Sequence, residues 1–263
     1  MHDDRFTPTL RTLAAGGLLL LSHLPLAVFA EPITVPHAEE YFPDQPGSRW
    51  KYRGYVEEGP LQKIAGKGFV NVSTVQGVEN LKGVTVKVFH DTNPGDHGPS
   101  DSYYRRDAVG IVYYGSQPGT PLEKQLVPYQ IVRFPLVIPS SFQQFDRKGV
   151  TLGTDLDGDE QDERADVEAT VTVMGQETVS VPAGSYQDAI RIEARMQMHV
   201  SLSGSQRKIY GTDVMTAWFA RGVGLITYVE RQELPPVRTD RGLITEITEE
   251  LEEVTIGGRQ VSP

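Results

Sequence analysis

The fold class of this chain is indicated most clearly by one stretch of alternating residues. Its sequence is Asp188-Ala189-Ile190-Arg191-Ile192-Glu193-Ala194-Arg195-Met196-Gln197-Met198-His199-Val200-Ser201-Leu202. Apolar side chains occupy every second position from Ile190 to Val200, and polar ones stand between them. Successive side chains of a β-strand point to opposite faces of its sheet, so this alternation predicts a long strand with one buried face. The segment follows Pro182-Ala183-Gly184-Ser185, a turn in which Pro fixes φ and Gly relaxes it.

Segments of the same kind lie on both sides of this stretch. Short β-type segments bounded by turn signals occupy residues 50–56, 69–75, 84–89, 110–114, 130–134, 167–174, 178–181, 215–220 and 225–229. The segment before Pro135 is predicted to be a short edge strand, and Arg221-Gly222-Val223-Gly224 to be a hairpin turn. Residues 244–256 fit a helix by their apolar spacing and a strand by their threonines, and the antiparallel surroundings favour the strand.

These segments predict a mainly β fold with few helices. We expect a single antiparallel domain over residues 49–263, built as a curved sheet, a roll or an open barrel, preceded by an extended lead-in at residues 31–48. No βαβ alternation and no repeat of fixed period is visible in the sequence. The Pro- and Gly-rich residues 115–149 are the alternative position for a boundary between two halves.

Two turn motifs carry a resemblance to a known group of proteins. They are Val181-Pro182-Ala183-Gly184-Ser185-Tyr186 and Trp218-Phe219-Ala220-Arg221-Gly222-Val223-Gly224-Leu225-Ile226. The pair resembles the VPAG(S/T)(Y/F) and W(F/Y)AxGVGL motifs of uncharacterised bacterial exported β-rich proteins and lipoproteins. The resemblance implies a curved antiparallel sheet, and some proteins of that shape carry lipid in the periplasm. It supplies no catalytic residues, and lipid tethering does not transfer because this chain lacks the cysteine that it needs.

Residues 1–30 are predicted to be a signal peptide. Arg5 and Arg11 precede an apolar run that ends at Val28-Phe29-Ala30, where small residues form a cleavage site before Glu31. The alternative is an uncleaved membrane anchor, which Gly16, Gly17 and Pro25 weaken. After cleavage we expect a periplasmic or secreted protein without stable membrane insertion.

Composition excludes several classes of function. The chain contains no cysteine, which removes thiol catalysis, thiolate metal sites and disulfides. Its formal net charge of −10 argues against a nucleic-acid partner, because such a partner requires a basic surface. The same charge argues against electrostatic docking on anionic lipid.

One acidic loop has the composition of a calcium site. Calcium needs six to eight oxygen ligands, and carboxylates at alternate loop positions can supply them. The candidate ligands, at positions 1, 3, 5, 7, 9 and 12 of a loop that resembles an EF-hand, are Asp155, Asp157, Asp159, Gln161, Glu163 and Asp166. Glu160 stands where the motif has Gly, and position 12 is Asp rather than Glu, so a solvated acidic turn remains the alternative. A bound Ca²⁺ would be structural.

No catalytic motif stands out. The cluster from His90 to Asp101 contains two His and three Asp, but without a metal-ligand spacing it is interpreted as a loop between strands. A hydrolase would need a pocket in which His90, His97 or His199 meets an acid or a serine, and the sequence alone shows no such pocket.

The aromatic residues offer the remaining hint. They are Tyr41, Phe42, Trp50, Tyr52, Tyr103, Tyr104, Tyr113, Tyr114, Trp218, Phe219 and Tyr228. They either line an apolar cavity or form ordinary core and cross-strand pairs. Three functional hypotheses follow. The first is a non-enzymatic exported protein that binds an apolar ligand or an envelope partner on its curved sheet. The second is an envelope scaffold with no small ligand, and the third and least supported is a hydrolase.

Overall fold

Two six-stranded meanders share one antiparallel sheet. The computed structural model describes residues 31–60, 64–237 and 242–261, so the predicted signal peptide lies outside the described residues. The first meander contains β2 (Arg49–Gly59), β3 (Ala65–Leu81), β4 (Val84–Asp91), β5 (Ser100–Asp107), β6 (Gly110–Gln117) and β7 (Tyr129–Arg133). The second contains β9 (Ser140–Thr151), β10 (Arg164–Val181), β11 (Gly184–Ser201), β12 (Lys208–Ala220), β13 (Gly224–Leu234) and β14 (Leu243–Ile256).

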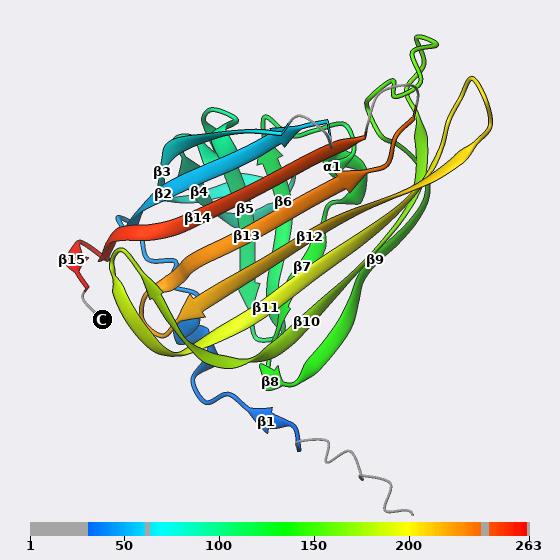
Figure 1. Cartoon of the computed structure of the whole chain (residues 1–263). Coiled ribbons are helices and arrows are strands. Elements are labelled where there is room, and N and C mark those ends of the chain that lie inside the picture. The colour runs from blue at the N-terminus through cyan, green and yellow to red at the C-terminus, as the bar shows by residue number, and fades with distance from the viewer. Residues whose placement is uncertain (1–30, 61–63, 238–241, 262–263) are drawn as a thin grey trace, which may run out of the picture. The chain divides into compact units, whose positions relative to one another are not determined.

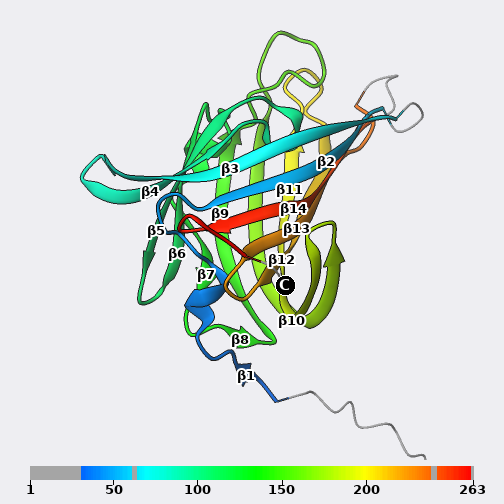
Figure 2. The ribbon, with the colours of Figure 1, turned by 90° about the vertical axis from the view of Figure 1, so that its left-hand side faces the viewer.

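Residues 32–263 form one compact unit in which the sheet curls nearly into a barrel (Figures 1 and 2). The two meanders join where β2 pairs with β14, in a ladder that runs from Arg49 opposite Thr255 to Gly59 opposite Ile244. At the other side β7 and β9 are both edge strands, and no backbone ladder connects them. We call the junction between β7 and β9 the seam.

The segment before β2 closes one end of the curled sheet. Its strand β1 (Ile33–Thr34) pairs with β8 (Val137–Ile138), and the Val35 amide donates to the Leu136 carbonyl at 2.8 Å. A short 3-10 helix, Ala38–Tyr41, then leads to Phe42, whose ring lies 4.9 Å from that of Phe219 on β12. The predicted lead-in is therefore packed into the fold rather than only extended.

The alternation of side chains decides which face is inside. On β10 and β11 the positions Val167, Val171 and Val200 are at most 2% exposed, while their neighbours along each strand are more exposed. The inner face holds most of the buried apolar side chains, and the outer face is mainly polar, as expected for an antiparallel sheet with one packed side. No helix within the described residues is long and apolar enough to cross a membrane.

The mainly β antiparallel fold is confirmed, and so is the strand at residues 244–256, which is β14. The predicted hairpin is also confirmed, because Ala220 pairs with Gly224 across it. The segments 167–174 and 178–181 are one strand, β10, interrupted by two register shifts. The segment 130–134 corresponds to the edge strand β7.

The sequence did not indicate β5, β9 or the short helix α1 (Glu123–Leu126). β5 has the sequence SDSYYRRD, which contains no aliphatic residue to give an alternating pattern. In β9 a register shift brings Phe142 and Phe145 to the same face although they are three residues apart, which hides the period of two. Residues 115–149, the alternative boundary, contain the turn between the two meanders and contribute strands to their common sheet.

Candidate functional site

Six aromatic rings form a continuous row along the inner face of the sheet. Neighbouring ring centroids are 6.2 Å apart for the first pair and 5.2–5.4 Å apart for the others. This aromatic row consists, in order, of Trp50, Phe89, Tyr104, Tyr113, Tyr129 and Phe145. Its last contact, between Tyr129 of β7 and Phe145 of β9, crosses the seam, so ring packing holds the two edge strands together where backbone bonds do not.

The middle of the aromatic row is not covered by the protein's own core. Phe89, Tyr104, Tyr113 and Tyr129 are only half-buried, whereas Val200 on the inner face of β11 is fully buried. Inward-facing aromatic surface that stays accessible is the usual lining of a small-molecule site, in which apolar walls carry a few polar groups. The inner face is therefore the strongest candidate for a binding site.

Polar groups surround the row. The Tyr113 hydroxyl hydrogen-bonds the Glu123 carboxylate of α1, and Ser116 Oγ donates to the same carboxylate at 2.9 Å. Burial raises the pKa values of Tyr104, Tyr113 and Tyr129 well above their usual range, and nearby negative charge adds to this effect. These hydroxyls therefore stay protonated, and those of Tyr104 and Tyr129 can donate hydrogen bonds to a ligand, while that of Tyr113 is bound to Glu123.

Two acidic side chains lie together on the inner face of β12 and β13. Gln232 Nε2 donates both to Asp213 Oδ2 at 3.3 Å and to Glu230 Oε1 at 3.0 Å. Burial, followed by the charge of Glu230, raises the pKa of Asp213 to about 8. Both carboxyls also contribute to the raised pKa of Tyr129 on β7, which places them in electrostatic reach of the aromatic row.

A third acid organises the inner face between β3 and β14. Glu249 is 1% exposed and accepts hydrogen bonds from Asn71 Nδ2 at 3.2 Å, the Gly95 amide at 3.0 Å and the Tyr228 hydroxyl at 3.1 Å. Burial raises the pKa of Glu249 despite these donors. Because all of its bonds go to the protein, we assign Glu249 to holding the loop at Pro94–Asp96 against the sheet.

A cavity of about 270 Å³, the seam cavity, lies between β7, β8, β9 and β10. Its walls are mostly apolar and include Phe142 together with Val171 and Ile192 of the inner face. Arg133 lines the same cavity, with its guanidinium carbon 4.2 Å from the centroid of the Phe142 ring. Elsewhere along the seam, Gln144 Nε2 of β9 donates to the Gln130 carbonyl of β7 at 3.1 Å.

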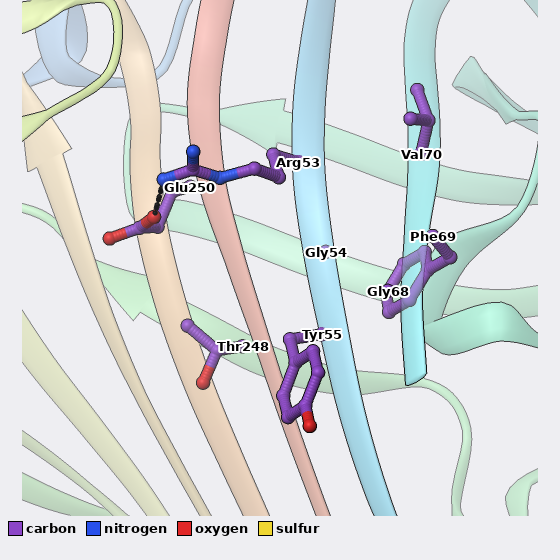
Figure 3. Close-up of a pocket in the computed structure, with 8 residues that line it drawn as sticks. All are labelled: Arg53, Gly54, Tyr55, Gly68, Phe69, Val70, Thr248 and Glu250. Atoms are coloured by element: carbon purple, nitrogen blue, oxygen red, sulfur yellow. Dashed lines mark hydrogen bonds and ion pairs between the residues drawn. The ribbon is translucent and has the colours of Figure 1, made fainter. Parts of the chain in front are cut away.

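A larger depression of about 400 Å³ lies on the outer face of β14, β2 and β3 (Figure 3). It exists because Gly68, which lies directly opposite Tyr55, presents no side chain there and leaves a hollow beside the Tyr55 ring. Arg53 and Glu250 point toward each other at its rim, with a nitrogen–oxygen distance of 2.7 Å. Because these charges are already paired and the hollow is open to solvent, it is a weaker candidate than the inner face.

The acidic loop gathers three of its six predicted ligands. Oxygens of Asp155, Asp157 and Asp159 lie within 4.8 Å of one another. Asp157 Oδ1 is buried and has no hydrogen-bond partner, while Oδ2 of the same carboxylate accepts from the Gly204 amide at 3.0 Å. Glu160 adopts a positive φ of 68°, the left-handed conformation that the motif normally obtains from Gly.

The other three predicted ligands point elsewhere. Glu163 is fully buried and accepts from the backbone amides of Leu156, Asp157 and Ser203, at 3.3, 3.3 and 2.7 Å. Gln161 is exposed, and its side chain contacts Asp159. Asp166 lies in β10 and accepts from the Gly149 amide at 2.8 Å, outside the group formed by the three aspartates.

The histidines are spread over the sheet. His90 Nδ1 lies 2.7 Å from Asp101 Oδ1 across β4 and β5, and neither residue lines the seam cavity or the outer depression. No hydroxyl among the described residues hydrogen-bonds to His90. The His199 ring packs edge-on against Tyr210, with centroids 4.8 Å apart. The cluster from His90 to Asp101 contains the ends of β4 and β5 and the loop between them.

The aromatic candidates divide between the two faces. Trp50, Tyr104 and Tyr113 belong to the aromatic row, and Tyr228 faces inward beside it. Tyr41, Phe42, Tyr52 and Phe219 pack in the buried clusters at the closed end of the sheet. Tyr103, Tyr114 and Trp218 alternate with inner residues and face outward. Sequence reasoning missed Phe89, Tyr129 and Phe145, although Phe89 and Tyr129 stand within or beside strands that it predicted.

Two crystal structures show a distant likeness to this chain. One is described as a lipoprotein from Parabacteroides distasonis, with a TM-score of 0.35 and 16% identity, covering 82% of this chain and 98% of that one. The other is described as an exported protein with a YmcC-like fold from Bacteroides fragilis, with a TM-score of 0.34 and 14% identity, covering 81% of this chain and 98% of that one. No protein-family model and no curated protein sequence matches the chain.

Proposed function

We propose that this chain is an exported, non-enzymatic binding protein that holds an apolar ligand against the inner face of its curved sheet. The observation that carries the proposal is the aromatic row, whose middle rings face inward and yet remain half-buried. Rings that packed only against the protein's own core would be as fully buried as the valines and isoleucine of β10 and β11. The pattern of residues 1–30 supports export.

The chemistry of the inner face favours a ligand that is mainly apolar. Aromatic rings contribute large apolar contact areas, and the tyrosine hydroxyls add donors at fixed positions. Ala194 on the inner face of β11 packs against the same cluster as Tyr104, so a large side chain at position 194 would occupy the space beside the row.

The test is binding of the apolar fluorophore N-phenyl-1-naphthylamine, whose emission rises in an apolar site. We expect the mature protein to bind it, and Ala194→Trp to weaken binding by about tenfold or more, which is about 1.4 kcal/mol. Gln197→Trp, at an exposed position of the same strand, is the matched control and should bind normally. No binding by the unmodified protein, or unchanged binding by a folded Ala194→Trp variant, would contradict the proposal. Either result would favour the alternative of an envelope scaffold with no small ligand.

A second proposal concerns the acidic loop, where we infer a structural Ca²⁺ site. The supporting observation is that carboxylate oxygens of Asp155, Asp157 and Asp159 lie within 4.8 Å of one another and that Asp157 Oδ1 is buried without a partner. Oxygen ligands of this kind suit Ca²⁺. The ion would connect the loop after β9 to the Ser203–Gly204 turn, which the aspartates already contact.

Thermal unfolding with and without metal tests this site. We expect CaCl₂ to raise the Tm of the chelator-treated protein and MgCl₂ to have less effect, because Ca²⁺ accepts irregular oxygen ligands more readily. Asp157→Asn should abolish the calcium effect, whereas Asp166→Asn, which changes an acid outside the group, should preserve it. A Tm that does not respond to CaCl₂ would leave the loop as a solvated acidic turn.

A further inference from the structure

We propose that the seam cavity binds the hydrocarbon chain of an amphiphilic anion and that the Arg133 guanidinium binds the anionic group of this ligand. This inference rests on the proposed function and names the class of ligand. The ligand would be a single hydrocarbon chain that ends in a carboxylate or a similar small anion. It would lie across the seam, with its charged end at the surface and its apolar end toward the inner face.

The walls of the cavity determine the apolar part of the ligand. Apart from Arg133, Ser140 and Ser141, every side chain that lines the cavity is apolar. Val171 and Val173 of β10 and Ile192 of β11 belong to the inner face, so the cavity extends from the seam into the curled sheet. A chain that entered between β7 and β9 would thus reach the same apolar cluster that Tyr104 packs against.

The size of the cavity limits the ligand to one narrow chain. Ligand pockets usually measure about 300–1,000 Å³, and the seam cavity, at about 270 Å³, falls just below this range. A fused-ring compound or a lipid with two chains would not fit without opening the seam. An unbranched chain of medium length is the apolar shape that suits such a volume.

The position of Arg133 indicates the polar group of the ligand. It is the only charged side chain that lines the cavity. In the part of the chain that the structure describes, no carboxylate oxygen lies within 4.0 Å of its guanidinium. Its Nε donates to Gln130 Oε1 at 3.0 Å, and its plane is held over the Phe142 ring. A guanidinium fixed in this way presents its remaining N–H groups for a planar anion such as a carboxylate.

The charge of Arg133 predicts different affinities for ligands with an anionic, a neutral or a cationic headgroup. A carboxylate would gain a charge-assisted bond to Arg133, a neutral hydroxyl would gain only an ordinary hydrogen bond, and an ammonium group would be repelled. The anionic preference is local, because the chain as a whole carries a formal charge of −10. Overall electrostatics would favour a cation, so a preference for the anion can be attributed to Arg133.

The experiment measures the binding of decanoate, 1-decanol and decyltrimethylammonium to the full mature protein directly, by isothermal titration calorimetry. We expect decanoate to bind about tenfold more tightly than 1-decanol, and decyltrimethylammonium to bind most weakly. Arg133→Gln should remove the advantage of decanoate and leave 1-decanol unchanged. Arg147→Gln, an exposed arginine on β9 that does not line the cavity, is the matched control and should behave as the unmodified protein.

The outcomes distinguish this inference from the function on which it rests. If the fluorophore binds and Ala194→Trp blocks it, but Arg133→Gln leaves decanoate affinity unchanged, the inner-face site stands and the role of Arg133 is refuted. If decyltrimethylammonium binds more tightly than decanoate, the anionic class is refuted. If neither the fluorophore nor any of the three decyl compounds binds, both proposals fail. Arg133 is exposed, so its replacement should leave the fold intact, which circular dichroism verifies.

Discussion

The ring contact between Tyr129 and Phe145 should account for a measurable part of the stability of the seam. Phe145 is 6% exposed, and its ring centroid lies 5.2 Å from that of Tyr129. Truncating a buried Phe to Ala costs about 3–5 kcal/mol. The specific pairing of two rings adds about 0.5–1.5 kcal/mol beyond buried area. We therefore expect Phe145→Ala to lower the free energy of unfolding by about 3–5 kcal/mol, with a coupling to Tyr129→Ala of about 0.5–1.5 kcal/mol.

The assay is a double-mutant cycle measured by urea unfolding. The cycle uses Tyr129→Ala, Phe145→Ala and the double variant, and takes the coupling as the departure from additivity. Tyr129→Ala combined with Val254→Ala, which lies in a different buried cluster, is the control and should be additive within about 0.5 kcal/mol. Additive effects at Tyr129 and Phe145 would refute the role of this ring pair in closing the seam.

Three further predictions concern single sites. Because the pKa of Asp213 is raised to about 8 from 3.8, its folded form stays protonated over a range in which the unfolded chain has lost the proton. Stability should therefore fall as pH rises from about 4 to about 8. Asp213→Asn should flatten this fall in thermal melts at several pH values, and an unchanged profile would contradict the burial of this carboxyl. Glu163→Gln should lower the free energy of unfolding in urea by about 1.5–3 kcal/mol, because an amide cannot accept from all three backbone donors, and an unchanged midpoint would contradict that role. Gly54→Ala should lower that free energy by about 1–3 kcal/mol, because its Cβ would overlap the Phe69 ring. Gly68→Ala, whose Cβ would have its nearest atom at 3.8 Å, is the control, and an equal loss of unfolding free energy in both variants would contradict the overlap.

Period-two alternation predicted the strands whose inner positions are consistently apolar. It succeeded on β11, where Ile190 to Val200 alternate without interruption, because one face of that strand packs against the core along its length. It failed on β5, where the inner position Tyr104 stands among polar residues. It also failed on β9, where a register shift puts Phe142 and Phe145 on the same face although they are three residues apart. Local pattern therefore detects regular strands and misses polar or bulged ones.

The aromatic row could not be predicted because it joins strands that are distant in sequence. Trp50 and Phe145 stand at its two ends on different meanders, and the seam that brings Tyr129 and Phe145 together depends on the curvature of the whole sheet. By contrast, the gathering of Asp155, Asp157 and Asp159 is local, and the loop spacing predicted it. The inward turn of Glu163 depends on Ser203, 40 residues away, so spacing alone could not reveal it.

The pairing of β2 with β14 has a consequence for how the chain acquires its structure. Within each meander, strands meet partners that are adjacent in sequence, so hairpins can form as soon as their residues are available. The edge of β2 that pairs with β14, however, gains its partner only when nearly the whole chain is present, because Trp50 pairs with Val254. Bringing such distant segments together is entropically costly and slow. A chain that crosses a membrane from its N-terminus would therefore complete this fold only after its C-terminal strand had emerged. Until then both edges at that junction would be exposed, so a chaperone that masks β2 would increase the folding yield more than one that masks a hairpin.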